Sequence, residues 1–157
     1  MPDYLQISVS TVKDLLQYFT DRSKSADNLR NNILREFRDN LKLLEHRNKA
    51  GVNSIALLQK LSVDAIGKAY ADNYKFDKLC EGPKQLPASL IMHKAQQKYV
   101  GWTATQFIYN IEGRINDLHN LPNLYSDLQT APINLALRLD NLYYQLLLFG
   151  LFISKKS

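Results

Sequence analysis

The sequence contains only one cysteine, Cys80, and few residues that break regular secondary structure. A single cysteine cannot form an internal disulfide, and it cannot supply the ligand set of a thiolate zinc site. The six glycines and five prolines are too few for the many turns of a β-sandwich. The composition therefore excludes a disulfide-stapled scaffold and favours helices joined by short turns.

Signatures of cofactor and metal chemistry are absent from the sequence. There is no glycine-rich phosphate loop, no GxGxxG dinucleotide fingerprint and no HExxH zinc motif. The three histidines, His46, His93 and His119, are far apart along the chain, whereas a metal site needs three or four ligands that converge. We therefore expect no cofactor and no metal.

The sequence also lacks a hydrophobic run that is long enough to span a membrane. A spanning helix needs about 20 mostly apolar residues, and the uninterrupted apolar run near the C-terminus covers only Leu146 to Ile153. A secretory signal begins with basic residues that an apolar stretch follows. The start of the chain, Met1 to Tyr4, does not have this pattern. These features predict a cytoplasmic protein and argue against a membrane partner.

Basic residues slightly outnumber acidic residues in the sequence. The 20 Lys and Arg against 15 Asp and Glu give a net charge of +5 and a pI near 9.3. This excess permits an acidic partner or nucleic acid but does not require one. The hydrophobic content of 45% is too high for a disordered chain, and 157 residues are enough for one core. We therefore predict a single domain over 1–157.

Hydrophobic periodicity predicts helices along most of the chain. The clearest pattern is an apolar stripe that recurs every three or four residues from Ala26 to Leu44. No alternation typical of strands extends over more than a few residues. We therefore predict an all-α antiparallel bundle of four main helices with one or two short extra helices. The expected segments are a first helix that ends near Arg22, then helices over 26–50, 53–69, 89–118 and 124–128, and a final helix that Thr130 caps, with Pro132 in its first turn.

The C-terminal segment from Leu142 to Ile153 is apolar on every side of a helix. Such a helix must be enclosed, either by its own bundle or by another molecule. Burial in the chain's own core is one interpretation, and a homo-oligomer or partner interface is the other, because aromatic residues are enriched at interface centres. The candidate interface residues are Leu142, Tyr143, Tyr144, Leu146, Phe149 and Phe152.

One short motif has catalytic character. Arg114 and His119 have the RxxxxH spacing, which resembles the active-site signature of the HEPN family of helical-bundle ribonucleases. The resemblance implies metal-independent RNA cleavage at a homodimer interface, with Arg114 on the scissile phosphate, His119 as general acid or base and Asn116 completing the site. A regular helix places Arg114 and His119 about 140° apart around its axis. The alternative interpretation is that both flank the core stripe, with Arg114 paired to a carboxylate.

A row of basic residues lies opposite the apolar stripe of the second predicted helix. This basic ridge consists of Arg35, Arg38, Lys42 and Lys49. Cations spaced along a rigid helix can follow the phosphates of a nucleic acid. However, acidic residues share the helix and no aromatic residues are interleaved for base stacking, so a solvated face is the alternative.

The absent cofactor motifs, the apolar C-terminus and the single-domain size together favour a function without catalysis. We expect a small helical protein-interaction module that is a homo-oligomer or the partner subunit of a larger complex. A HEPN-like ribonuclease and a basic helical protein that binds RNA or DNA are the alternatives.

Overall fold

Four long helices and two short ones build the described part of the chain. The structure is a computed structural model that describes residues 9–128 and 131–155, with side chains described from residue 11. Over those residues it contains helices and 3-10 turns but no strand, which confirms the all-α prediction. The elements are α1 (Val9–Arg22), α2 (Asn28–Glu45), α3 (Ser54–Lys60), α4 (Asp64–Ala71), the 3-10 turns η1 (Phe76–Leu79), η2 (Ala88–Leu90) and η3 (Lys94–Tyr99), then α5 (Ala104–Leu124) and α6 (Leu135–Ser154).

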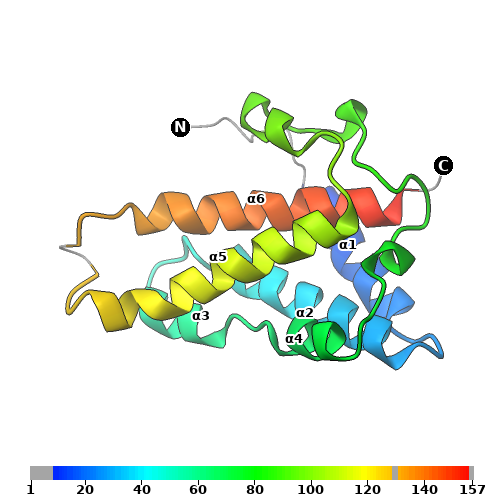
Figure 1. Ribbon diagram of the computed structural model, residues 1–157. Helices are drawn as coiled ribbons and strands as arrows, with labels where there is room; N and C mark the ends of the chain where they lie inside the picture. Colours follow the sequence, from blue (N-terminus) through cyan, green and yellow to red (C-terminus); the bar gives the residue numbers. More distant parts are fainter. Residues whose placement is uncertain (1–8, 129–130, 156–157) are drawn as a thin grey trace.

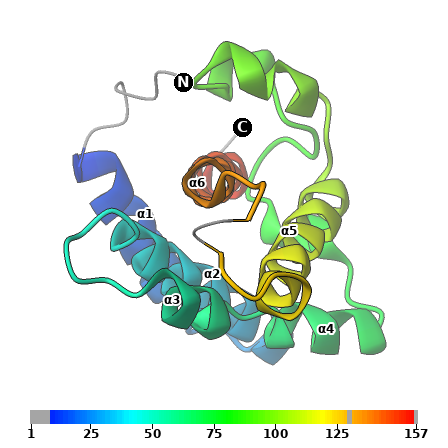
Figure 2. The same ribbon diagram turned by 90° about the vertical axis from the view of Figure 1, so that its left-hand side faces the viewer.

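The C-terminal helix α6 is the centre of the bundle. Viewed from one end, α1, α2, α3 and α5 surround it (Figure 2). It runs in the direction opposite to α2 and α5 (Figure 1), and it contacts α1, α2 and α5. Twelve of its twenty residues are buried. An all-round apolar helix needs such an enclosure, so the position of α6 follows from its sequence.

Phenylalanine rings join the helices around α6. The ring of Phe149 lies 5.1 Å from that of Phe37 on α2 and 5.4 Å from that of Phe107 on α5, measured between centroids. Phe19 on α1 extends the cluster to Phe37, at 6.3 Å. Gly150 allows α1 to approach, because a Cβ there would lie 3.1 Å from Cζ of Phe19. Four helices therefore share one aromatic core.

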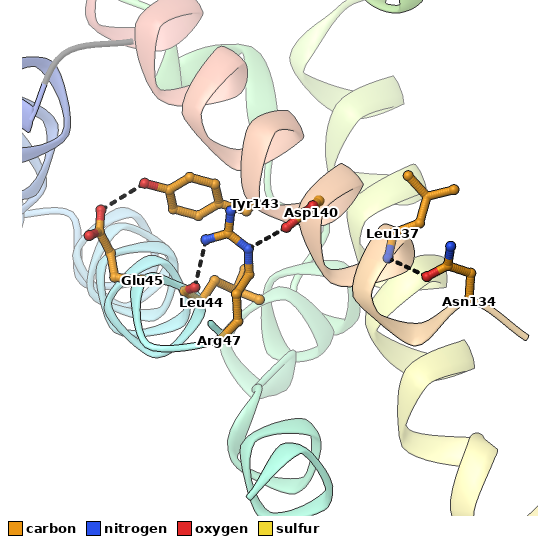
Figure 3. A network of polar contacts seen from close by, with 7 residues as sticks. All are labelled: Leu44, Glu45, Arg47, Asn134, Leu137, Asp140 and Tyr143. Atoms are coloured by element: carbon orange, nitrogen blue, oxygen red, sulfur yellow. Dashed lines mark hydrogen bonds and ion pairs between the residues drawn. The ribbon is translucent and has the colours of Figure 1, made fainter. Parts of the chain in front are cut away.

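A polar network fixes the end of α2 against α6 (Figure 3). Arg47, just beyond α2, donates from Nε to Oδ1 of Asp140 at 2.6 Å and from Nη1 to the carbonyl oxygen of Leu44 at 2.9 Å. Its guanidinium lies 4.0 Å from the ring centroid of Tyr143, whose hydroxyl donates to Glu45 at 2.8 Å. The ionic side chains are only 10% and 11% exposed, so the pair is screened little by water.

The third predicted helix forms two helices, α3 and α4, because side chains of α2 bind the backbone between them. Asn40 donates from Nδ2 to the carbonyl oxygen of Ser62 at 2.8 Å, and its Oδ1 accepts from the Ser62 N–H at 2.9 Å. The buried Glu36 carboxylate accepts from the N–H groups of Ala65 and Ile66 in the first turn of α4. These bonds satisfy backbone groups that a continuous helix would pair internally.

The prediction of one helix over 89–118 is wrong in its first half. This part contains only η2 and η3, and α5 begins at Ala104. Gly101 has a φ of +86°, a left-handed conformation that interrupts a helix. Thr103 and Gln106 then form a capping box that starts a new helix.

The predictions for the chain between α5 and α6 also need correction. Helix α5 continues through Pro122 to Leu124, and no separate helix covers 124–128. The side chain of Asn134 caps α6 by accepting from the Leu137 N–H at 3.0 Å (Figure 3), so Pro132 precedes the helix. The predicted cap Thr130 lies outside the described residues. In the described ranges, none of the helices has the length and apolarity that crossing a bilayer requires.

Candidate functional site

In the structure, the two residues of the RxxxxH motif form hydrogen bonds with different neighbours. Arg114 donates from a terminal guanidinium nitrogen to the hydroxyl of Tyr99, in η3, at 3.1 Å. His119 donates from Nε2 to the carbonyl oxygen of Leu61, at the end of α3, at 2.7 Å. Asn116 is exposed. Within one chain the three residues are therefore not brought to one point, as the angular separation on a regular helix requires.

The alternative interpretation of Arg114 is also only partly right. The described ion pairs join Arg22 to Glu81, Arg38 to Asp39 and Arg47 to Asp140. Arg114 thus has a neutral hydroxyl as its partner, and among the described residues no carboxylate lies within 4.0 Å of it. Burial raises the pKa of the Tyr99 hydroxyl, while the neighbouring Arg114 acts in the opposite direction. The tyrosine is therefore a neutral support for the guanidinium.

A small pocket lies beside Arg114 in the seam between α5 and α6. It encloses about 210 Å³, and we call it the arginine pocket; its lining residues are Arg114, Asp117, Leu118, Arg138 and Asn141. One turn from the pocket, toward the C-terminus of α6 and the N-terminus of α5, Gln145 donates from Nε2 to Oδ1 of Asn110 at 2.6 Å, although Gln145 is only 1% exposed. The seam is therefore polar at a place where two core helices meet.

The basic ridge is less available for phosphates than its sequence implies. Arg35 donates to the carbonyl oxygen of Ser23 at 2.9 Å, and Arg38 pairs with Asp39 at 3.0 Å. Lys42 and Lys49 are exposed. A groove of about 470 Å³ beside the ridge combines cations with an equal number of acids: Arg35, Lys60 and Lys68 with Glu36, Asp39 and Asp64. Around Arg35 and Arg38, the basic ridge is thus a surface of mixed charge.

The residues predicted as an interface on the C-terminal helix are occupied by the chain's own core. Five of the six are buried, namely Leu142, Tyr143, Leu146, Phe149 and Phe152, and Tyr144 is partly buried. Of the two interpretations of this segment, burial in the bundle is the one that the structure has. Most of the candidate interface residues therefore pack within the bundle, whose other helices lie around α6 (Figure 2).

A groove lined by both apolar and polar residues lies at one end of the bundle and was not predicted from the sequence. We call it the end groove; it has a volume of about 640 Å³, and its lining residues are Gly51, Val52, Asn53, Ser54, Ile55, Asp127, Leu128 and Leu135. At the same end, where α5 finishes and α6 begins, Leu124 is 71% exposed and Leu137 is 37% exposed. The available signal was the presence of apolar residues in segments that connect helices, where polar residues are usual.

Comparisons with known proteins identify no family for this chain. No protein-family model, no curated protein and no solved structure matches the chain. The resemblance to HEPN ribonucleases therefore stays a prediction. Across the described ranges, no three His, Cys, Asp or Glu side chains are grouped so that they could hold a metal ion.

Proposed function

We propose that this protein is a small helical interaction module that self-associates through the end groove. The observation that carries the proposal is the concentration of exposed apolar side chains at that end of the bundle. Of the large hydrophobic residues that are exposed in the described part of the chain, Val52, Ile55, Leu124 and Leu137 lie at this end. Patches of this kind on a soluble domain commonly mark sites of protein association.

A second copy of the chain suits this surface because the surface combines a groove with exposed apolar residues at the same end of the bundle. Leu128 and Leu135 lie in the wall of the groove, whereas Leu124, which does not line it, is 71% exposed. In a two-fold dimer, each copy presents the same patch to the other, so exposed side chains of one copy can enter the groove of the other. Such a contact buries apolar surface at about 25 cal/mol per Å².

Light scattering on purified protein tests the proposal. We expect a mass of twice 18.1 kDa at micromolar concentration, falling toward 18.1 kDa on dilution. Leu124→Gln should shift the protein to monomer, because it places an uncompensated amide in the contact.

Tyr109→Gln is the matched control, since Tyr109 is 72% exposed on the same helix but lies in its first half, away from the end groove. It should leave the mass unchanged. A protein that stays at 18.1 kDa at every concentration, or a dimer that Leu124→Gln and Tyr109→Gln affect equally, would contradict self-association through this end.

A further inference from the structure

Two arginines line the arginine pocket, and neither guanidinium forms an ion pair with a carboxylate of the described residues. Arg114 comes from α5 and Arg138 from α6. Neither takes part in the ion pairs found among the described residues, which all lie elsewhere. Asp117 lines the pocket as well, but its carboxylate is not within 4.0 Å of either guanidinium. The pocket therefore holds positive charge that the protein does not neutralise by close pairing.

The residues that line the arginine pocket are held on two helices, α5 and α6. Arg138 and Asn141 are three residues apart on α6, and Arg114 and Asp117 are three residues apart on α5, so each pair shares one helix face. Tyr99, a residue that is only 4% exposed, holds the Arg114 guanidinium by accepting its hydrogen bond at the hydroxyl. A donor that is already held in place loses little conformational entropy when an anion arrives.

We propose that the arginine pocket binds the phosphate group of a small phosphate monoester. Two guanidinium groups match the two negative charges of such a group, and their N–H forks fit its oxygens in a bidentate way. The Asn141 amide can donate to a third oxygen. Pockets for drug-sized ligands have about 300–1,000 Å³, so the 210 Å³ here suit one anionic group with its nearest atoms. This site is separate from the end groove and does not depend on self-association.

Asp117 should affect phosphate binding in the direction opposite to that of the two arginines. Its carboxylate lines the same space and repels an incoming anion, which sets a limit on affinity. Removing that charge should strengthen phosphate binding, whereas removing either guanidinium should weaken it. A pocket that only served to satisfy its own side chains would not respond to ligand in this opposed pattern.

Isothermal titration at low ionic strength tests the site, with inorganic phosphate, ribose 5-phosphate and AMP as probes and adenosine and acetate as controls. We expect binding of all three phosphates, and tighter binding of ribose 5-phosphate or AMP identifies a sugar phosphate or a nucleotide as the source. Arg138→Gln should weaken binding about ten-fold or more, because it removes a charged hydrogen-bond donor. Asp117→Asn should tighten it. Arg138 is exposed, so its replacement should leave the fold intact.

Lys42→Gln is the matched control, because it removes the same charge from an exposed position on α2. It should leave phosphate affinity within a small factor of the parent protein. The proposal is overturned if phosphate and its esters do not bind, if acetate binds as well as phosphate, or if Lys42→Gln and Arg138→Gln weaken binding equally. An Arg114→Gln variant that loses its helical circular dichroism would not affect these outcomes, which rest on Arg138 and Asp117.

Discussion

At the scale of single residues, Cys80 is a buried thiol that should not react while the protein is folded. It is 8% exposed, and burial raises its pKa from 9.0 to about 11. The thiolate is the reactive form, so at pH 8 the folded protein should react with a disulfide reagent far more slowly than the unfolded protein. The absorbance of the released thiol measures both rates; equal rates would show that the side chain is accessible.

The same thiol makes a signed contribution to pH dependence. Its pKa is higher in the folded state, so the folded state holds the proton more tightly. The associated stability is fully present below pH 9 and is lost as pH rises through about 11. Denaturant unfolding at pH 8 and pH 11 should show a smaller loss for Cys80→Ala than for the parent protein. An identical loss in both proteins would remove this thiol from the alkaline transition.

His119 should behave as a structural residue. Its Nε2 donates to the carbonyl oxygen of Leu61, a helix-end group that would otherwise lose its partner. His119→Ala should therefore lower the free energy of unfolding by about 1–3 kcal/mol, measured by urea titration. Asn116→Ala, on the exposed face of the same helix, should change it little. A fully stable His119→Ala protein would instead agree with the surface catalytic residue that the HEPN resemblance implies.

At the scale of elements, the ion pair between Arg47 and Asp140 connects α2 with α6. Because both side chains are nearly buried, removal of one partner leaves an uncompensated charge. Asp140→Asn should cost about 3 kcal/mol in the free energy of unfolding. Asp39→Asn breaks the more exposed pair with Arg38 and should cost at most about 1 kcal/mol. Similar costs for the two variants would show that the buried pair has no special role.

Two glycines in helices should respond in opposite directions to alanine. At Gly150 of α6 the new Cβ would meet Cζ of Phe19 at 3.1 Å and the methyls of Leu15 at 3.3 Å, so α1 must move. Gly150→Ala should destabilise the bundle by about 1–3 kcal/mol. At Gly113 of α5 nothing lies within 4 Å, and alanine should stabilise the helix by about 0.5–1 kcal/mol. Thermal unfolding compares them, and a stabilising Gly150→Ala would mean that α1 yields without cost.

The helices that could be predicted from sequence are those that local pattern alone determines. The stripe from Ala26 to Leu44 predicts α2, and the all-round apolar C-terminus predicts an enclosed helix. The break between α3 and α4 could not be predicted, because Asn40 and Glu36 cause it from another helix. The irregular stretch before α5 also could not be predicted, because the residue type alone does not show that Gly101 adopts a left-handed conformation.

The candidate sites show the same division at a larger scale. The RxxxxH spacing is visible in the sequence, but only the packing around α5 decides that Arg114 meets Tyr99 and His119 meets Leu61. Arg138 joins Arg114 from a different helix, so spacing alone could not pair them. The end groove combines the loop before α3 and the start of α3 with residues that follow α5 and the first residue of α6. Sites of this kind depend on which helices are neighbours.

At the scale of the whole molecule, the central claim is that two bundles meet at their end grooves. Spin labels test it directly, because Cys80 is buried and an introduced exposed cysteine should be the labelled one. We place one label by Asn123→Cys, beside Leu124, and in a separate protein another by Lys155→Cys, at the far end of α6; both positions are exposed.

Pulsed electron paramagnetic resonance measures the distance between the two labels of a dimer. A helix of 20 residues is about 30 Å long. If two bundles meet at their end grooves, the labels at position 123 should lie less than about 30 Å apart and those at position 155 about 60 Å apart, since the far ends of both bundles then point away from the contact. No coupling at position 123, or a shorter distance at position 155 than at position 123, would contradict it.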